Sequence, residues 1–285
     1  MGLPLVVVHG GAGAWKDERI PIGVEHVAKA AEVAFQTLLS LGSALDAAEA
    51  CTIYMENCGQ LNAGAGATKN LADEQELDAM IVDGSKLQFG SVASVTGIQN
   101  PISLARYVME KTEYSMFAGI GAEMLYKKMI EEGYRKEARR CIIRDPFATE
   151  TADTVGCIVV DELGRMAATS STGGIRGKLK GRVGDSPVFG AGAFANDIAV
   201  ATATGYGEHI MRVTLSRLVV QFIESGLHPQ AAADKGMAFF SEKTGSEAGI
   251  IAANAKGEWG RATNAKAMPV AIIDTNLESM VSFER

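Results

Sequence analysis

The chain has 285 residues, of which 47% are hydrophobic and 21% charged, so it is long enough to bury a sizeable core. With 7 prolines, 32 glycines and no low-complexity tract, its composition argues against a disordered or fibrous protein. The formal net charge of -7 supplies no basic field for a phosphate backbone, which disfavours nucleic-acid binding as a main role.

The N-terminal segment carries no basic region and only a short apolar run, Leu5–Val8, which indicates a buried first strand rather than a signal peptide. No stretch approaches the roughly 20 apolar residues that span a bilayer, so we expect no membrane segment. The four cysteines form no C-x-x-C pair, and no N-x-[ST] sequon occurs. Reduced thiols in a cytoplasmic protein are therefore favoured over disulfides or a metal site.

The first half of the chain is predicted to be rich in helices. Apolar residues at helical spacing predict a helix over Glu25–Leu41 that stops at Gly42, and Ser43 is placed to cap a second helix ending at about Met55. Continuous or alternating apolar runs predict strands, and further periodic segments predict helices. The strands are Leu5–Val8, Leu77–Val82 and Ser91–Ile98, and the further helices are Ile102–Glu110 and Met116–Glu132.

The interval Gly133–Asp153 differs from its surroundings, because it combines five basic residues, a proline and a Thr/Glu/Asp run without periodicity. We interpret it as an exposed linker. Beyond it, strands are predicted at Val155–Val160, Met166–Thr169, Ala199–Thr204, Gly249–Ala253, Val270–Asp274 and Met280–Phe283, and helices at Glu208–Ser225 and Gln230–Phe240. Helices grouped between sets of strands favour one layered α+β domain over residues 1–285 rather than βαβ alternation.

Two glycine-rich turns, Gly11–Lys16 and Gly64–Lys69, invite a nucleotide-binding interpretation, but each lacks the third glycine of G-x-G-x-x-G. Gly177-Lys178 is followed by leucine rather than the Ser or Thr of a phosphate loop. There is no G-x-S-x-G, and the four histidines are scattered, so zinc and serine-hydrolase chemistry have little support. A nucleotide-binding or small-molecule-binding α/β protein stays as the alternative of a different class.

A threonine, Thr154, stands where the exposed linker meets a buried strand, within the run Asp153-Thr-Val-Gly-Cys-Ile-Val-Val-Asp161. Taken alone it is an ordinary β-branched residue that starts a strand. If the preceding peptide bond is cut, however, a new α-amine lies on the same Cα as the hydroxyl. Its reference pKa of about 7.7–8.0 suits a general base that activates that hydroxyl. No histidine is then required.

The sequence resembles the plant-type L-asparaginase/isoaspartyl peptidase family of N-terminal-nucleophile hydrolases along nearly its whole length. No single motif is specific, but their order and spacing together are. The matching segments are His9–Gly13, Leu61–Gly66, Asp78–Gly84, Asn100–Arg106, Thr154–Gly156, Ser171–Gly174, Gly181–Ser186, Gly190–Gly192 and Thr204–Glu208.

The resemblance implies a four-layer αββα sandwich and self-cleavage between Asp153 and Thr154, giving fragments 1–153, which ends in the linker at about 133–153, and 154–285. It also implies a homodimer of cleaved protomers that hydrolyses L-asparagine or β-aspartyl (isoaspartyl) peptides. By the same resemblance a structural monovalent cation lies near Asn57–Ala63, held by loop carbonyls. No other cofactor or metal is expected.

The resemblance also assigns residues to the reaction. Thr154 corresponds to the nucleophile and Thr172 to the neighbouring hydroxyl that orients it and assists self-cleavage. Arg182 and Asp185 correspond to the clamp on an amino-acid head group, since a guanidinium fork holds a carboxylate and a carboxylate accepts from an ammonium. Thr204 and Gly205 correspond to the oxyanion hole. Two more residues are assigned to substrate binding: Gly207 and Asn62.

The sequence departs from the family pattern at four places, one of which is a residue missing between Gly192 and Thr204. Asp153 replaces the usual glycine before the nucleophile, as in glycosylasparaginases and threonine endoproteases of the taspase type. Tyr206 replaces the histidine of Thr-Gly-His-Gly, and the linker is shorter than in many members. Glycosylasparaginase activity with the same nucleophile is therefore the alternative within the same class.

Overall fold

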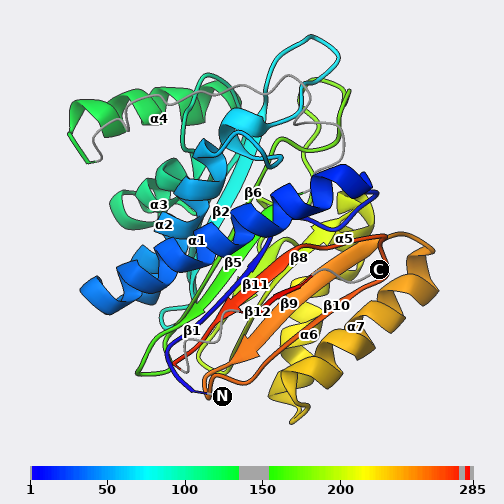
Figure 1. Ribbon diagram of the computed structural model, residues 1–285. Coiled ribbons are helices and arrows are strands. Elements are labelled where there is room, and N and C mark those ends of the chain that lie inside the picture. The colour runs from blue at the N-terminus through cyan, green and yellow to red at the C-terminus, as the bar shows by residue number, and fades with distance from the viewer. Residues whose placement is uncertain (1, 135–153, 276–279, 283–285) are drawn as a thin grey trace.

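Two β-sheets occupy the centre of the structure, a computed structural model that describes residues 2–134, 154–275 and 280–282 (Figure 1). The larger sheet has eight strands in the order β12-β11-β1-β5-β6-β2-β3-β4, and all neighbours are antiparallel except β3 and β4. These strands are β1 Leu5–His9, β2 Leu77–Asp83, β3 Gln88–Val95, β4 Met116–Ala118, β5 Val155–Val160, β6 Met166–Thr172, β11 Val270–Ile273 and β12 Met280–Ser282.

The smaller sheet has four antiparallel strands in the order β10-β9-β8-β7. They are β7 Ala193–Ala195, β8 Ala199–Gly205, β9 Ala248–Asn254 and β10 Trp259–Thr263. This sheet packs face to face on the larger one, with β8 lying over β5 and β6.

Helices cover the outer faces of both sheets (Figure 1). The long helices α1 and α2 lie over β1, β5 and β6, α3 lies over β2 and β3, and α6 and α7 lie over the smaller sheet. The helices are α1 Ile20–Leu41, α2 Ala44–Asn57, α3 Pro101–Lys111, α4 Gly119–Glu131, α5 Gly207–Val213, α6 Leu215–Glu224 and α7 Pro229–Thr244, with short 3-10 turns η1 Asp17–Arg19 and η2 Gly64–Gly66.

Alternation along the central strands explains why this arrangement buries both faces of the larger sheet. In β5, Val155, Cys157 and Val159 join the apolar layer beneath α1 and α2, whereas Ile158 and Val160 join the layer between the sheets. A strand covered on both faces reads as a continuous apolar run, which is the pattern predicted for it.

The layer between the sheets changes character from one end to the other. At one end it is filled by apolar side chains such as Leu5, Val7 and Val160. At the other end the same faces of the same strands carry buried polar side chains, at His9, Asp78, Thr154, Ser170, Thr172, Thr202 and Thr204. Because buried polar groups need partners, this end of the layer is the place to examine for chemistry.

Most predicted elements are confirmed, including the left-handed Gly42 that ends α1 and the Ser43 hydroxyl that accepts from the Asp46 N–H at the start of α2. The mixed α/β class with two sheets is also confirmed. One predicted helix is wrong in part, since Glu208–Ser225 is divided into α5 and α6 by Thr214, whose φ is 47°. Met116–Ala118 is a strand rather than the start of a helix, and β7 and β10 were not predicted.

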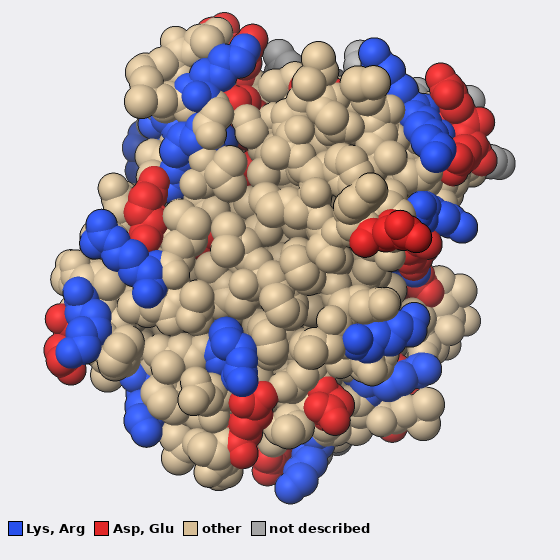
Figure 2. All heavy atoms as spheres, turned by 180° about the vertical axis from the view of Figure 1, so that it is seen from behind, with Lys and Arg blue, Asp and Glu red and all other residues tan. Residues whose placement is uncertain are grey.

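Most of the predicted linker, from residue 135 to Asp153, lies outside the described residues. Cys51, Cys58 and Cys157 are free thiols. No helix of the described part is long and apolar enough to cross a membrane. On the face shown in Figure 2, basic and acidic side chains are mixed around the rim and no continuous basic area is seen.

Candidate active site

Thr154 lies at the polar end of the layer between the sheets, directly before β5, and its side chain is buried. Its Oγ1 lies 3.1 Å from the Oγ of Ser186, within hydrogen-bond distance. The register pairs Val155 with Ser171 of β6, so one further step along it sets Thr154 opposite Thr172. The strand pairing therefore brings together two hydroxyls that are 18 positions apart in the sequence.

Thr172 ends β6, and the turn after it is fastened by hydrogen bonds. The Gly174 N–H donates to Thr172 Oγ1 at 2.9 Å. The Asn62 amide donates to the Gly174 carbonyl at 2.8 Å, and its Oδ1 accepts from the Thr68 N–H at 2.9 Å. One end of the Asn62 amide thus holds this turn and the other end is held by Thr68, which places Asn62 in support of Thr172.

Thr204 faces the same layer from the smaller sheet. Its Oγ1 accepts a hydrogen bond of 3.1 Å from the backbone N–H of Ala12, in the glycine-rich turn after β1. Since a hydroxyl both donates and accepts, the proton of Thr204 stays available for a further acceptor. Gly205 follows with a φ of 135°, and a Cβ there would lie 2.6 Å from the Cα of Ala248. Both facts require glycine at this position.

Arg182 and Asp185 lie together beside the start of α5. Arg182 makes a two-point contact with Glu208, Nε to Oε1 at 2.8 Å and Nη2 to Oε2 at 2.7 Å. A Cβ on Gly207 would lie 2.7 Å from Asp185 Oδ1 and 3.1 Å from Arg182 Nη2. The absence of a side chain at Gly207 therefore keeps open the space beside both charged groups.

The guanidinium of Arg182 retains most of its donors. Glu208 takes the N–H of Nε and one N–H of Nη2, which leaves the end of the fork formed by Nη1 and Nη2. Burial opposes the charge of Arg182, but the contact with Glu208 outweighs it, so the pKa of Arg182 is raised. Arg182 in turn lowers the pKa of Glu208. Arg182 is thus a fixed cation whose Nη1 and Nη2 edge is not occupied by any residue in the described part of the chain.

His9 lies beneath this cluster and is fully buried. Burial lowers the pKa of His9 to about 3, so the ring is neutral near pH 7. Its Nε2 would lie 2.3 Å from a Cβ built on Gly156, which explains the glycine two positions after Thr154. A buried, neutral histidine packed against the backbone of Gly156 has a structural role here.

Two more charged residues lie near the cluster without having been predicted as site residues. Asp78, on β2, is fully buried, and burial raises its pKa to about 6. Lys178 is also buried, which lowers its pKa, and its Nζ donates to the Glu76 carbonyl at 3.1 Å. The positive charge of Arg182 acts to lower the pKa of both groups.

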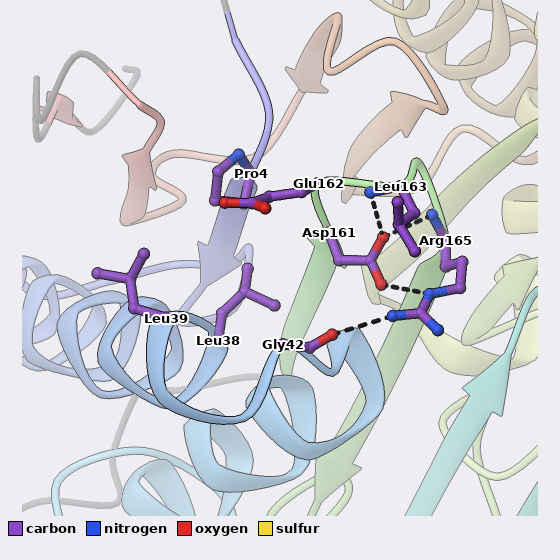
Figure 3. Close-up of a pocket in the computed structure, with 8 residues that line it drawn as sticks. All are labelled: Pro4, Leu38, Leu39, Gly42, Asp161, Glu162, Leu163 and Arg165. Carbon is purple, nitrogen blue, oxygen red and sulfur yellow. Dashed lines mark hydrogen bonds and ion pairs between the residues drawn. The ribbon is translucent and has the colours of Figure 1, made fainter.

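A pocket of about 280 Å³ lies at the opposite end of β5, between Pro4, Leu38 and the turn Asp161–Arg165 (Figure 3). In it Arg165 bonds to Asp161 at 2.7 Å and to the Gly42 carbonyl at 3.0 Å, so its polar groups are engaged with each other. None of the predicted site residues lines this pocket. It is distinct from the cluster around Thr154.

Comparison with known proteins decides the family. The sequence model of a family described as Asparaginase matches residues 2–144 and 126–282. The chain belongs to this family. It is 37% identical over 284 residues to an isoaspartyl peptidase/L-asparaginase of Homo sapiens, covering 94% of this chain and 92% of that protein. A plant-type L-asparaginase of Thermococcus kodakarensis is 35% identical over 300 residues, with 96% and 97% covered.

A further relative is the isoaspartyl peptidase/L-asparaginase of Danio rerio, at 37% identity over 272 residues, or 90% of this chain and 88% of that protein. The predicted family resemblance is therefore confirmed. The self-cleavage site is not described by the structure, because Asp153 lies outside the described residues.

Sequence reasoning also missed two residues of this asparaginase-family site that bond directly to predicted site residues. Ser186, bonded to Thr154, is the last residue of the Gly181–Ser186 motif, and Glu208, bonded to Arg182, is the last of Thr204–Glu208. Their membership of those motifs was the available signal.

Tyr206, at a departure from the family pattern, is about half exposed, and its ring lies 4.8 Å from that of His209.

No group of three or more His, Cys, Asp or Glu residues that could hold a metal occurs among the described residues. The loop Asn57–Ala63, where a monovalent cation is expected, runs from the end of α2 towards η2. That cation stays a prediction.

Proposed function

We propose that this member of the asparaginase family is a self-activating threonine amidohydrolase that cleaves L-asparagine, β-aspartyl peptides or both. The observation that carries the proposal is the buried Thr154 hydroxyl directly before β5, 3.1 Å from the Ser186 hydroxyl and opposite Thr172 when the β5–β6 register is extended by one residue. The relatives' names, isoaspartyl peptidase/L-asparaginase and plant-type L-asparaginase, support the same substrates.

In the proposed activation, the Thr154 hydroxyl attacks the carbonyl carbon of residue 153. Transfer of the acyl group from nitrogen to oxygen gives an ester, and water then releases the carboxylate of fragment 1–153. Fragment 154–285 keeps a free α-amine on the nucleophile itself. Such an amine has a reference pKa of about 7.7–8.0, so its neutral form is available as a general base near neutral pH.

In the proposed hydrolysis, the amine accepts the hydroxyl proton while Oγ1 attacks the side-chain amide carbon. The resulting oxyanion needs donors, and Thr204 supports this role because its oxygen accepts from Ala12 and its proton is available. The Gly205 N–H is the proposed second donor. Thr172 is the proposed orienting hydroxyl, with Asn62 holding its turn. The amine or ammonia leaves, and water hydrolyses the ester.

The substrate's head group is proposed to bind Arg182 and Asp185. The α-carboxylate takes the Nη1 and Nη2 edge of Arg182, and the α-ammonium lies between Asp185 and the Gly207 carbonyl. The support is the charge of these two groups, of which Asp185 is buried and Arg182 partly buried, and the open space at Gly207. A clamp of both signs selects an intact amino-acid head group and so presents its β-amide to Thr154.

The order of layers, helices, two facing sheets and helices, supports assignment to the αββα sandwich of N-terminal-nucleophile hydrolases. A homodimer of cleaved protomers is part of the proposal on the family resemblance. Sedimentation of the cleaved protein tests it.

The decisive experiment follows the chain and the product together. Denaturing electrophoresis with N-terminal sequencing should give fragments that begin at Met1 or Gly2 and at Thr154. Ammonia release from asparagine and cleavage of a β-aspartyl dipeptide should both be assayed, because they rank the two substrates. Thr154→Ala should give an uncut and inactive chain, whereas Thr154→Ser should retain part of both activities. Full turnover by a chain that never breaks at this junction would refute the proposal.

Glycosylasparaginase activity is the second candidate, and Asp153 is the feature that favours it. An asparagine bearing an N-linked sugar is the discriminating substrate. Turnover of it at a rate comparable with that of asparagine would assign the chain to that activity.

A further inference from the structure

Asp78 and Thr172 are cross-strand neighbours that face the same layer. Asp78 of β2 pairs with Thr172 of β6 in an unbroken antiparallel register. Met80 and Val82 continue the inward face of β2, and Met166 and Ala168 that of β6, so both polar side chains lie between the sheets. Directly opposed residues on one face have Cβ atoms about 4.5–5.5 Å apart, which a carboxylate and a hydroxyl can bridge.

The two carboxylate oxygens of Asp78 differ in their hydrogen bonding. Its Oδ1 accepts the backbone N–H of Ser94 at 2.7 Å, which fixes the carboxyl group. Its Oδ2 is buried and has no hydrogen-bond partner in the described part of the chain. A buried carboxylate oxygen without a donor is costly, so this atom is poised to accept.

The hydroxyl of Thr172 has a matching unused donor. A hydroxyl offers one proton and two acceptor positions. The Gly174 N–H occupies one acceptor position, and the described residues supply no acceptor for the proton. If that proton goes to Asp78, the second lone pair is left to accept from Thr154, whether from its hydroxyl or from its α-amine.

The charges around Asp78 favour its ionised form. A Cβ on Gly174 would lie 3.1 Å from Lys178 Nζ and 3.2 Å from Arg182 Nη1, so both cations flank the turn after Thr172. Both oppose the burial that raises the pKa of Asp78, whereas Glu76 adds to it. Asp78 therefore changes charge near neutral pH, in the range where the site would operate.

We infer that Asp78 is a positioning residue of the proposed hydrolase: its Oδ2 accepts the Thr172 proton and so directs the remaining lone pair of Thr172 at Thr154. The bond forms on a small rotation of either side chain, which brings the two oxygens to about 2.5–3.0 Å. This inference rests on the proposed function. It assigns Asp78 to the orientation of the nucleophile rather than to the substrate's head group.

The test substitutes Asp78→Asn, which keeps the acceptor for Ser94 but replaces Oδ2 with a donor. The Thr172 proton then loses its acceptor, and we expect kcat per cleaved chain to fall about 10- to 100-fold, the range for a hydrogen bond to a charged group. KM should change less than about twofold, because the head-group contacts are untouched. A chain that melts like the wild type but stays uncut also supports the inference, since Thr172 is assigned to both steps.

The pH profile separates positioning from a merely structural role. In the wild type, the fall of kcat/KM towards acid pH should show the dependence on one proton as the α-amine is protonated. Below about pH 6 it should show the steeper dependence on two protons, because Asp78 also gains one. Asp78→Asn should show the one-proton dependence throughout. Asp83→Asn, the same change at the far end of β2, should behave as wild type.

Several results would overturn the inference. They are a wild-type profile with one proton down to pH 4.5, an Asp78→Asn variant within twofold of wild-type kcat, or a loss confined to KM. A wild type that hydrolyses none of the proposed substrates would instead refute the proposed function, which keeps the two failures distinguishable.

Discussion

The Oγ1 of Thr154 and the Oγ of Ser186 lie 3.1 Å apart and are both buried, so the start of β5 is tied to the loop that carries Arg182 and Asp185. Ser186 directly follows Asp185. The proposed nucleophile and the proposed substrate clamp are therefore joined by one hydroxyl pair, and disturbing it should affect the reaction without removing either group.

Replacing Ser186 with alanine should slow hydrolysis per cleaved chain by about 3- to 10-fold, the equivalent of one neutral hydrogen bond of about 1 kcal/mol. The measurement is kcat/KM on asparagine after complete cleavage. Ser170→Ala is the matched control, because its hydroxyl is buried in the same layer but has no partner among the described residues. Equal losses in the two variants would argue against a specific Ser186 contact.

Glu208→Gln should raise KM several-fold and leave kcat nearly unchanged. The carboxylate holds Arg182 at two points, and the amide retains only one acceptor, so the guanidinium becomes less well oriented for the substrate carboxylate. Steady-state kinetics on asparagine measure the effect. The control is Glu224→Gln, a residue away from the site. It loses a single contact, the one of 2.9 Å with Arg217. An unchanged KM would show that Glu208 does not orient Arg182.

Gly207→Ala should weaken substrate binding more strongly than the change at Glu208. The added methyl group would lie 2.7 Å from Asp185 Oδ1, so it either displaces the carboxylate or fills the head-group space. We expect KM to rise by about tenfold or more. Gly121→Ala, in α4, should have no effect, because nothing lies within 4 Å of its added Cβ. Wild-type KM in the Gly207 variant would place the head group elsewhere.

The sequence predicted the strands and helices of this fold where the pattern is local, and missed features that depend on tertiary contacts. The apolar spacing from Glu208 to Ser225 is helical throughout, yet Thr214 adopts a left-handed conformation that divides the segment. Such a residue is held by its surroundings and leaves no periodic signal. Likewise Trp259–Thr263 is only half buried, and its alternation of buried and partly exposed residues is too short to predict a strand.

The candidate site divides in the same way. Thr154 was singled out because a threonine at a linker–strand junction can supply both nucleophile and base after cleavage, and the family resemblance then assigned it that role. Ser186, Glu208 and Asp78 were missed because each matters only through a partner on another element, namely Thr154, Arg182 and Thr172. Sequence motifs name residues, whereas strand register and loop packing decide which of them meet.

The stability of the fold should depend on pH through Glu56. This carboxyl lies under β6, where it accepts from Ser171 Oγ at 2.7 Å and from the Ile102 N–H at 3.1 Å. Burial raises the pKa of Glu56 from 4.5 to about 8. The folded chain then binds more protons than the unfolded chain between these values. Its contribution to stability is full below about pH 4.5 and is lost as pH rises to about 8.

Glu56→Gln removes this dependence, so the variant should gain stability relative to the parent as pH rises, on the order of a few kcal/mol by pH 9. Urea unfolding at pH 5, 7 and 9 measures it, in a Thr154→Ala background so that each molecule is one chain. The exposed Glu242→Gln should show no such trend. A constant difference between Glu56→Gln and its parent across this range would contradict the assignment.

Thr204→Ala should lower kcat by about 10²–10³-fold, because one of two proposed oxyanion donors is removed. The substitution has a second effect: the Ala12 N–H loses its acceptor, which costs about 1–3 kcal/mol of stability if no water replaces it. Thr204→Ser separates the two effects, since it keeps the hydroxyl for both neighbours and should retain kcat within about tenfold. If Thr204→Ala instead keeps kcat within fivefold while its melting temperature falls, then Thr204 serves the glycine-rich turn at Ala12 and the oxyanion is stabilised elsewhere.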